Sequence, residues 1–343
     1  MFDSRKTILT VALLSAVMVS SAVLADDFTP GPGTKYATDA YPGFDSEDDI
    51  YDEGRKTPRW FGWFNGPAKA TAEEQFAWAA ACESNKAWRA ARKGYDALVR
   101  AWPASPEAPL AQKALADLVF AHDLEYDQAF DEYRYLLDYY STQCDFDAIA
   151  LRLYEVAKLM REAGKRFVFL RFDNTVDVRR AFEAVVLRAP GASYAPAAMI
   201  AIGELREDEG QFEKAVQAYE TLRNLYPNTA EAKTSVLSEA RVRMQLLKEH
   251  DYNRPRCLDT IGFLKQAVAG SDVATRPQLE RWHAEAVALL EDEAYRAAKF
   301  YDSRTRTRRS AINAYERFLS DYPASAHVEE VRARLTELQQ EGK

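Results

Sequence analysis

The sequence predicts an all-α protein in which pairs of helices follow one another as an α-solenoid. Three observations favour this fold class: amphipathic stretches succeed one another from Thr71 to the C-terminus, strand patterns are scarce, and one helical signature recurs. FVFLRF, at 167–172, has strand character, but it is short and we expect a connection there. With 343 residues, of which 47% are hydrophobic, the chain can bury a core along such an array.

Residues 1–25 have the layout of a secretory signal peptide: a basic start, an apolar run from Ile8 to Leu24, and the small residue Ala25 before Asp26. We therefore expect export and cleavage after Ala25. The alternative is an uncleaved membrane anchor, because the apolar run approaches the ~20 residues that a span needs. No Cys lies near the cleavage point, so the sequence offers no acceptor for bacterial lipid attachment.

Residues 26–70 read as a flexible segment that contains Pro and Gly. The acidic run DSEDDIYDEG, at 45–54, has little apolar surface to offset the loss of chain entropy on ordering, which favours a solvated tether. RWFGWFNGP, at 59–67, is different because it holds four aromatic residues. We expect this cluster to pack on the first helix of the body; a plug for a partner protein is the alternative.

The body, residues 71–343, opens with Thr71-Ala-Glu-Glu74, a capping-box pattern that satisfies free backbone N–H groups at a helix start. A signature then recurs: a small residue, an aromatic four positions later, a large apolar residue three beyond it, and Pro five further on. Positions separated by four and three share one helix face. The copies are Ala91, Tyr95, Leu98, Pro103; Val178, Phe182, Val185, Pro190; Ala215, Tyr219, Leu222, Pro227; Ala311, Tyr315, Phe318, Pro323; and Ala129, Tyr133, Leu136 with Ser141 replacing Pro.

Each signature ends a helix, since Pro cannot continue one. Ser105, Thr229 and Ser325 follow these prolines and are expected to cap the next helix. The aromatic anchors Tyr95, Tyr133, Phe182 and Tyr219 lie 38, 49 and 37 residues apart, near the ~34-residue period of tetratricopeptide helix pairs. A divergent unit fits around CLDTIGFLKQAV, at 257–268. We therefore expect five or six helix pairs.

Motifs for catalysis, cofactors and metals are missing from the sequence, which has no phosphate-binding loop, dinucleotide fingerprint, H-E-x-x-H or C-x-x-C pattern. We expect no enzyme, no cofactor and no metal site. The acidic triplet 207–209 is interpreted as a solvated turn before Gly210, and the scattered histidines as structural or solvated. Each of Cys82, Cys144 and Cys257 is expected to be a small buried residue, with one disulfide bridge as the alternative. A net charge of −8 disfavours nucleic acid and anionic lipid as partners.

The second half resembles a known family. GQFEKAVQAYETLRNLYPNTAEA, DYNRPRCLDTIGFLKQAV, LEDEAYRAAKFY and SAINAYERFLSDYPASAHVEEVRARL are similar, in that order, to successive units of the BamD (YfiO) family of outer-membrane assembly lipoproteins. The most specific element is ALLEDEAYRAAKFY, at 288–301. The resemblance covers residues 180–336, whereas residues 71–179 share with the family only the general pattern of helical repeats.

The resemblance implies an exported, periplasmic scaffold at the outer membrane that supports assembly and insertion of β-barrel proteins. Its C-terminal repeats would dock on the POTRA domains of a BamA-like barrel protein, and its N-terminal repeats would receive unfolded outer-membrane protein segments. The candidates for partner docking are Arg304, Arg306, Arg308 and Arg309 in the last inter-helix loop, with Phe300 and Tyr301 close by. The alternative for the two aromatics is burial in the core, and for the arginines simple solvation.

This chain departs from the family pattern in three places: it lacks the lipidated Cys, its last inter-helix loop is more basic, and Ala314 stands where Arg is expected after Asn313. Membrane association would then be indirect. A second hypothesis is a general periplasmic tetratricopeptide adaptor for other envelope machinery, which the missing Cys favours. A toroidal helical enzyme acting on carbohydrate is the third, and the short helix pairs ending in Pro argue against it.

Overall fold

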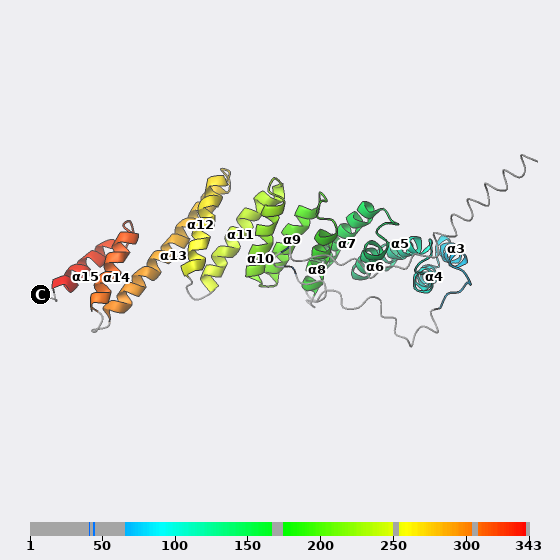
Figure 1. Ribbon diagram of the computed structural model, residues 1–343, viewed down its shortest axis with the longest axis horizontal. Helices are drawn as coiled ribbons and strands as arrows, with labels where there is room; N and C mark the ends of the chain where they lie inside the picture. The colour runs from blue at the N-terminus through cyan, green and yellow to red at the C-terminus, as the bar shows by residue number, and fades with distance from the viewer. Residues whose placement is uncertain are drawn as a thin grey trace, which may run out of the picture. The chain divides into compact units, whose positions relative to one another are not determined.

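The computed structural model describes residues 41, 44, 66–166, 174–249, 254–303 and 308–340, and these contain 13 α-helices and no strand (Figure 1). The predicted all-α class is confirmed. Residues 1–25, most of 26–65 and the stretch 167–172 lie outside the described residues, so the signal peptide, its cleavage after Ala25 and the FVFLRF connection stay predictions. No helix in the described part combines the length and apolarity needed to cross a bilayer.

The chain divides into two compact units, of which the first ends at Glu209 and the second begins at Gly210. The first unit contains α3 (Ala72–Ser84), α4 (Trp88–Ala101), α5 (Ala108–Leu118), a π-helical turn (Val119–Asp123), α6 (Tyr126–Tyr140), α7 (Phe146–Arg166), α8 (Asn174–Arg188) and α9 (Ala195–Asp208). The second contains α10 (Phe212–Leu225), α11 (Ala230–Glu249), α12 (Arg254–Gly270), α13 (Arg276–Asp302), α14 (Arg308–Asp321) and α15 (Val328–Gln340).

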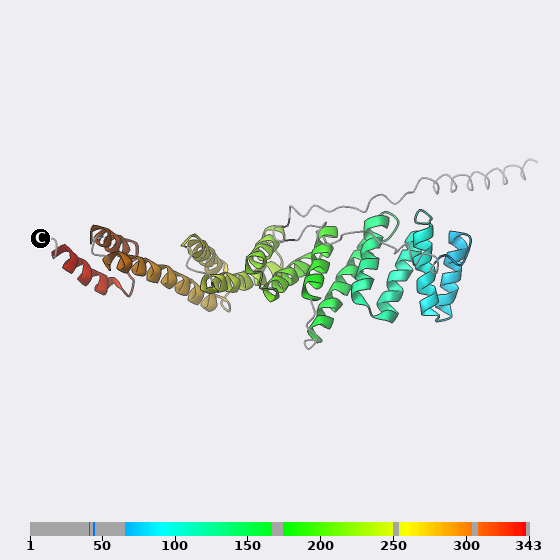
Figure 2. The same cartoon turned by 90° about the horizontal axis from the view of Figure 1, so that it is seen from below.

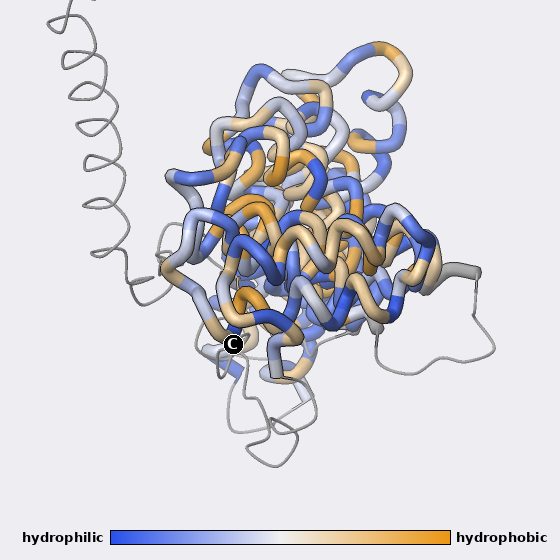
Figure 3. Tube along the Cα trace, turned by 90° about the vertical axis from the view of Figure 1, so that its right-hand side faces the viewer, coloured by the Kyte–Doolittle hydropathy of each residue, from blue (hydrophilic) through white to orange (hydrophobic). Residues whose placement is uncertain are grey.

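Within each unit, every helix packs against the next one along the chain (Figures 1 and 2). Apolar and polar residues alternate along the helical trace, as amphipathic helices require (Figure 3). This nearest-neighbour packing is the principle of a helical-repeat protein, in which each repeat buries its apolar face against the adjacent one.

The recurring signature marks every second helix, and the core prediction is confirmed. All fifteen positions are at most 3% exposed: Ala91, Tyr95, Leu98, Ala129, Tyr133, Leu136, Val178, Phe182, Val185, Ala215, Tyr219, Leu222, Ala311, Tyr315 and Phe318. They lie on α4, α6, α8, α10 and α14, and α12 supplies the divergent copy, with Cys257 and Leu264 buried. The even-numbered helices from α4 to α14 thus carry the signature or its divergent copy, and α15 follows them.

The prolines end their helices as predicted. α4, α8, α10 and α14 each stop two residues before Pro103, Pro190, Pro227 and Pro323, because the residue preceding Pro is disfavoured in the α conformation.

Of the predicted helix caps, Thr71 accepts from the Glu74 N–H at 3.3 Å and Thr229 accepts from the Ala232 N–H at 3.2 Å. Ser105 does not cap α5: its backbone carbonyl accepts from the Ala108 N–H, so a backbone turn starts the helix. The carbonyl of Ser325 accepts from the Val328 N–H, and its side-chain Oγ accepts from the His327 N–H at 3.3 Å, just before α15.

A tyrosine-to-carboxylate hydrogen bond recurs between the two helices of a pair. The hydroxyl of Tyr95 on α4 donates to Glu83 at 2.7 Å, and that of Tyr133 on α6 donates to Asp117 at 2.5 Å. Tyr315 on α14 donates to Asp302 at 3.1 Å. In each case the carboxylate lies near the end of the preceding helix, so the buried aromatic anchor satisfies its polar end without leaving the core.

The interpretation of the acidic triplet as a solvated turn is wrong for Glu209, whose side chain is only 6% exposed. Glu209 accepts from Arg179 of α8 at 2.8 Å. Glu183 accepts from Arg179 at 2.8 Å and from Arg206 at 3.0 Å. Because Arg206 on α9 and Glu209 directly after its end lie three positions apart, both face α8, and the four side chains form a buried cluster with balanced charge.

The three cysteines are not joined by disulfides. Cys257 is 1% exposed, as predicted, and its Sγ donates to the carbonyl of Ala286 at 3.4 Å. Cys82 and Cys144 are only partly buried, which corrects the expectation for these two.

Candidate protein-docking site

The C-terminal end of α13 carries the two exposed aromatic candidates. Phe300 is 51% exposed and Tyr301 is 42% exposed, so the alternative of core burial is wrong. Helix periodicity explains the difference: the buried face of α13 passes through Tyr295 and Ala298, and its next position is Asp302. The rings of Phe300 and Tyr301 meet edge to face, with centroids 5.8 Å apart.

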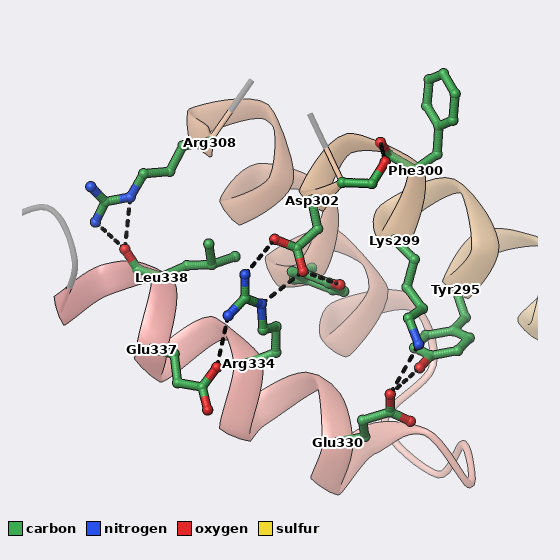
Figure 4. A network of polar contacts seen from close by, with 11 residues as sticks. Tyr295, Lys299, Phe300, Asp302, Arg308, Glu330, Arg334, Glu337 and Leu338 are labelled. Carbon is green, nitrogen blue, oxygen red and sulfur yellow. Dashed lines mark hydrogen bonds and ion pairs between the residues drawn. The ribbon is translucent and has the colours of Figure 1, made fainter. Parts of the chain in front are cut away.

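Asp302 ties this end of α13 to the two helices that follow. Arg334 of α15 donates to its two carboxylate oxygens from Nε at 2.8 Å and Nη2 at 3.0 Å (Figure 4). These bonds, with that of Tyr315, hold the pKa of Asp302 below its ordinary value although partial burial opposes the shift. Burial, together with the charge of Asp302, raises the pKa of Tyr315 to about 12. The carboxylate is therefore ionised and acts as a fixed junction of three helices.

A second polar cluster lies one turn earlier on α13. The hydroxyl of Tyr295 and the ammonium of Lys299 both donate to Oε1 of Glu330 on α15, the latter at 3.2 Å (Figure 4). The bond from Tyr295, with that from Lys299, lowers the pKa of Glu330. The ring of His327 stacks on that of Tyr295 at 4.0 Å. α15 therefore contacts the C-terminal part of α13 at two places, at Glu330 and at Arg334. Phe300 points away from these contacts (Figure 4).

The arginine candidates divide into three cases. Arg304 and Arg306 lie outside the described residues. Arg308 and Arg309 were expected in the inter-helix loop, but they form the first turn of α14. Arg308 donates from Nε to the carbonyl of Leu338 at 2.8 Å, near the C-terminal end of α15 where cations are favoured, whereas Arg309 is exposed. Among the described candidates, Phe300, Tyr301 and Arg309 are exposed, and Arg304 and Arg306 stay predictions.

Sequence reasoning missed Asp302 and Arg334, which support this surface together with Tyr315. The available signal is the spacing on α13, where Asp302 follows Ala298 by four positions on the buried face. A carboxylate at a buried helical position requires a donor, and Tyr315 was already predicted to point inward.

No group of three or more His, Cys, Asp or Glu side chains that could hold a metal ion occurs in the part of the chain that the structure describes. His122 stacks on Trp88 and His327 on Tyr295, while His250 lies outside the described residues. The charged side chains described above on α13 and α15 are paired with one another. The aromatic rings exposed at the end of α13 are those of Phe300 and Tyr301.

Helices that pack in series against their neighbours are the arrangement of a helical-repeat protein, and here two aromatic side chains are exposed at the end of α13. Residues 197–229, which lie in α9, α10 and the turns beside them, match the tetratricopeptide repeat family. The signature at Ala215, Tyr219, Leu222 and Pro227 is part of this match. The chain therefore contains one segment similar to a tetratricopeptide repeat, a type of repeat that stacks to present an extended binding surface.

The chain is also similar to solved structures. One is a tetratricopeptide repeat protein from Parabacteroides merdae, at 14% identity and a TM-score of 0.29, covering 78% of this chain and 98% of that one. Another is PilW, a widely conserved type IV pilus biogenesis factor, at 14% identity and a TM-score of 0.29, covering 77% and 99%. A third is PilF of Pseudomonas aeruginosa, at 15% identity and a TM-score of 0.27, covering 77% and 97%. TM-scores this low establish no shared function. No curated protein matches the sequence significantly.

Proposed function

We propose that the protein is a non-catalytic, exported scaffold that supports assembly of β-barrel proteins in the outer membrane. It does so by docking on the POTRA domains of a BamA-like partner through Phe300, Tyr301 and Arg309. The observation that carries the proposal is the exposed aromatic pair at the end of α13, beside the junction at Asp302. It lies within the segment whose sequence resembles the BamD family.

Exposed aromatic side chains and an exposed arginine have the composition of an interface hot spot. Aromatic residues and Arg are enriched among the few side chains that supply most binding energy, since they bury much area at a small cost in side-chain entropy. Phe300 leaves about half of its surface in water in the isolated chain. Covering both rings with an apolar pocket would contribute on the order of 2 kcal/mol or more.

The polar contacts beneath the aromatics supply preorganisation. Arg334 fixes Asp302, which directly follows Tyr301, so the last turn of α13 is ordered before any partner arrives. Order that exists in the unbound protein does not have to be created on binding, and this raises affinity. A rigid edge on a helical scaffold is also the mode of action of repeat proteins, which present extended surfaces.

Residues 1–25 support the proposed location, because they have the layout of a secretory signal. The absence of a lipid-acceptor Cys near Ala25 means that, in this proposal, the anchored partner keeps the scaffold at the membrane. In this proposal the association with the outer membrane therefore depends on partner binding. If the exported chain has no membrane-embedded partner, both parts of the proposal are wrong.

A general adaptor for other envelope machinery is the second candidate, and one observation favours it. Leu110 on α5 is 54% exposed and Leu151 on α7 is 44% exposed, so the first unit also offers apolar side chains to solvent. An adaptor that uses this unit would lose its partner on replacing Leu110 and Leu151 by Ser and would be indifferent to changes at Phe300.

Affinity enrichment from gently solubilised envelopes of the native host tests the proposal. The tagged chain is compared with Phe300→Ser/Tyr301→Ser and with a matched control, Leu258→Ser, which removes another exposed apolar side chain of the second unit, 47% exposed. We expect a POTRA-bearing barrel protein to be enriched by the parent and the control and lost from the double variant. Enrichment of other envelope proteins alone, retained by all three, would move the function to the general adaptor.

A further inference from the structure

A buried glutamine lies at the same position of two helices, α3 and α5. Gln75 on α3 donates from Nε2 to the carbonyl of Gly94 at 3.0 Å, and Gln112 on α5 donates from Nε2 to the carbonyl of Glu132 at 2.8 Å. Gly94 and Glu132 each directly precede the aromatic anchor of their helix. Both glutamines are fully buried. The two side chains are therefore equivalent members of consecutive repeats.

The amide oxygen of Gln75 is satisfied by the chain that enters α3. Its Oε1 accepts from the backbone N–H groups of Ala68 at 2.9 Å and Lys69 at 3.0 Å, which lie seven and six residues earlier in the sequence. An amide oxygen has two lone pairs, so these two hydrogen bonds use its capacity as an acceptor. Gln75 therefore shows where the donors for this side chain come from, namely from the residues just before the helix.

The amide oxygen of Gln112 is buried as well, but it accepts no hydrogen bond from the described residues. The network fixes which end of the amide is the oxygen, because Nε2 also donates to Oε2 of Glu132 at 2.7 Å. Turning the amide over would place its oxygen against two acceptors. Buried water molecules in proteins typically bond to polar groups that are otherwise unsatisfied in this way.

The backbone before α5 does not supply these donors. The residues seven and six positions before Gln112 are Ser105 and Pro106. The N–H of Ser105 donates to the carbonyl of Trp102 at 3.0 Å, and Pro106 has no N–H. The hydroxyl of Ser105 remains, and its Oγ is buried without a hydrogen-bond partner among the described residues. Ser105 and Gln112 therefore each bury one polar group that the described chain leaves unsatisfied.

Helix geometry directs the Gln112 amide toward Ser105. The carbonyl of Ser105 accepts from the N–H of Ala108, the first residue of α5, at 3.0 Å, so the chain turns into the helix at this point. Gln112 follows Ala108 by four residues, a rise of ~6 Å, and the side chains of a helix tilt toward its N-terminus. Ser105 Oγ and Gln112 Oε1 do not bond to each other directly. Two hydrogen bonds through one water molecule span about 5–6 Å.

We infer that one water molecule is bound between Gln112 Oε1 and Ser105 Oγ and donates to the amide oxygen in place of the backbone N–H groups that Gln75 receives. Water suits this pair because Gln112 Oε1 needs a donor, the Ser105 hydroxyl either donates or accepts, and water does both. The two groups offer the smallest number of hydrogen bonds that buried water molecules ordinarily make. The inference does not rest on the proposed function, and it assigns a bound ligand to the interior of the first unit.

A crystal structure of the full-length chain, at a resolution that shows ordered water, tests the site directly. We expect a density peak for one water oxygen at about 2.7–3.2 Å from both Gln112 Oε1 and Ser105 Oγ. Gln75 is the internal control, since Ala68 and Lys69 should donate to it with no water between. A direct hydrogen bond between Ser105 and Gln112, a protein atom or metal ion at the expected position, or no peak there would overturn the inference.

Thermal unfolding measured by calorimetry supplies an independent test. Ser105→Ala is expected to lower the unfolding midpoint by about 2–4 °C, because the water molecule loses one of its two partners. In a Gln112→Met background the same change should shift the midpoint by less than half as much, since the shared water is gone. Ser193→Ala, at an exposed serine before α9, is the matched control and should leave the midpoint unchanged.

Equal shifts for Ser105→Ala in the two backgrounds would contradict a ligand shared by the two side chains. The crystallographic result decides if Gln112→Met does not fold.

Discussion

Arg334 and Asp302 form a two-point contact in which Nε and Nη2 of the guanidinium each donate to a different carboxylate oxygen, at 2.8 and 3.0 Å (Figure 4). The contact joins the last residue of α13 to the middle of α15, and Tyr315 of α14 donates to the same carboxylate. Three helices therefore meet at one ionised side chain directly after Phe300 and Tyr301. The pose of the proposed docking surface depends on this junction.

Asp302→Asn is expected to lower the free energy of unfolding by about 1–2 kcal/mol, because an amide cannot accept both hydrogen bonds of the guanidinium. This loss in the free energy of unfolding lies at the lower end of the range for hydrogen bonds to charged groups, because Arg334 is 37% exposed and water screens the ion pair. Urea unfolding followed by circular dichroism measures it. Asp321→Asn, at an exposed ion pair with Arg317, is the matched control and should change stability by less than about 0.5 kcal/mol.

The same junction predicts a pH dependence. The folded-state pKa of Asp302 is lower than its ordinary value of 3.8, so its contribution to stability is fully present well above pH 3.8 and is lost as pH falls through that value toward the folded pKa. The stability difference between the parent and Asp302→Asn should therefore shrink as pH is lowered from about 5 to about 3. If this difference stays constant over the range, the ionised form of the Asp302 carboxylate does not contribute to stability.

Glu183→Gln is expected to destabilise the first unit by about 3 kcal/mol or more. Glu183 is fully buried and accepts from both Arg179 and Arg206, so the change removes the shared charge partner of two buried guanidiniums. Chemical denaturation gives the value, with Asp208→Asn, an exposed acid on α9, as the control within about 0.5 kcal/mol of the parent. A loss below about 1 kcal/mol would mean that the cluster relaxes or admits water.

Two glycine replacements of the same kind should have opposite effects. A Cβ at Gly94 would lie 2.8 Å from both the Cβ of Ala79 and Cζ3 of Trp78, so Gly94→Ala forces α3 away from α4 and should cost about 1–3 kcal/mol. At Gly262, on α12, nothing lies within 4 Å of the added atom, and Gly262→Ala should stabilise by about 0.5–1 kcal/mol through helix propensity. Calorimetric thermal unfolding of the two variants checks both signs, and a stabilising Gly94→Ala would refute the close approach of α3 and α4.

The core was predictable from the sequence because it rests on local spacing. The small, aromatic and apolar residues of the signature recur at four and three positions, which fixes one helix face whatever the partner helix is. The Pro that lies two residues beyond four of these helices is equally local. Hence the buried anchors from Ala91 to Phe318 followed from the residues alone.

The polar contacts were not predictable in this way because they join residues far apart in the chain. Asp302 and Arg334 are 32 positions apart, and Arg179 and Glu209 are 30 apart. Spacing cannot show that such residues meet, so Glu209 was misread as a solvated acid. The sequence offered both exposure and core burial for Phe300 and Tyr301, and it could not decide between them because the answer depends on where the buried face of the long helix α13 runs.

The most direct test of the central claim is a titration of the purified chain against the soluble POTRA domains of the barrel-assembly protein of the same organism, by calorimetry or biolayer interferometry. The account predicts binding that weakens at least 30-fold in Phe300→Ser/Tyr301→Ser, as expected for about 2 kcal/mol of lost hot-spot energy, and that is unchanged in Leu258→Ser. Absence of binding by the parent chain, or equal weakening in both variants, would contradict it.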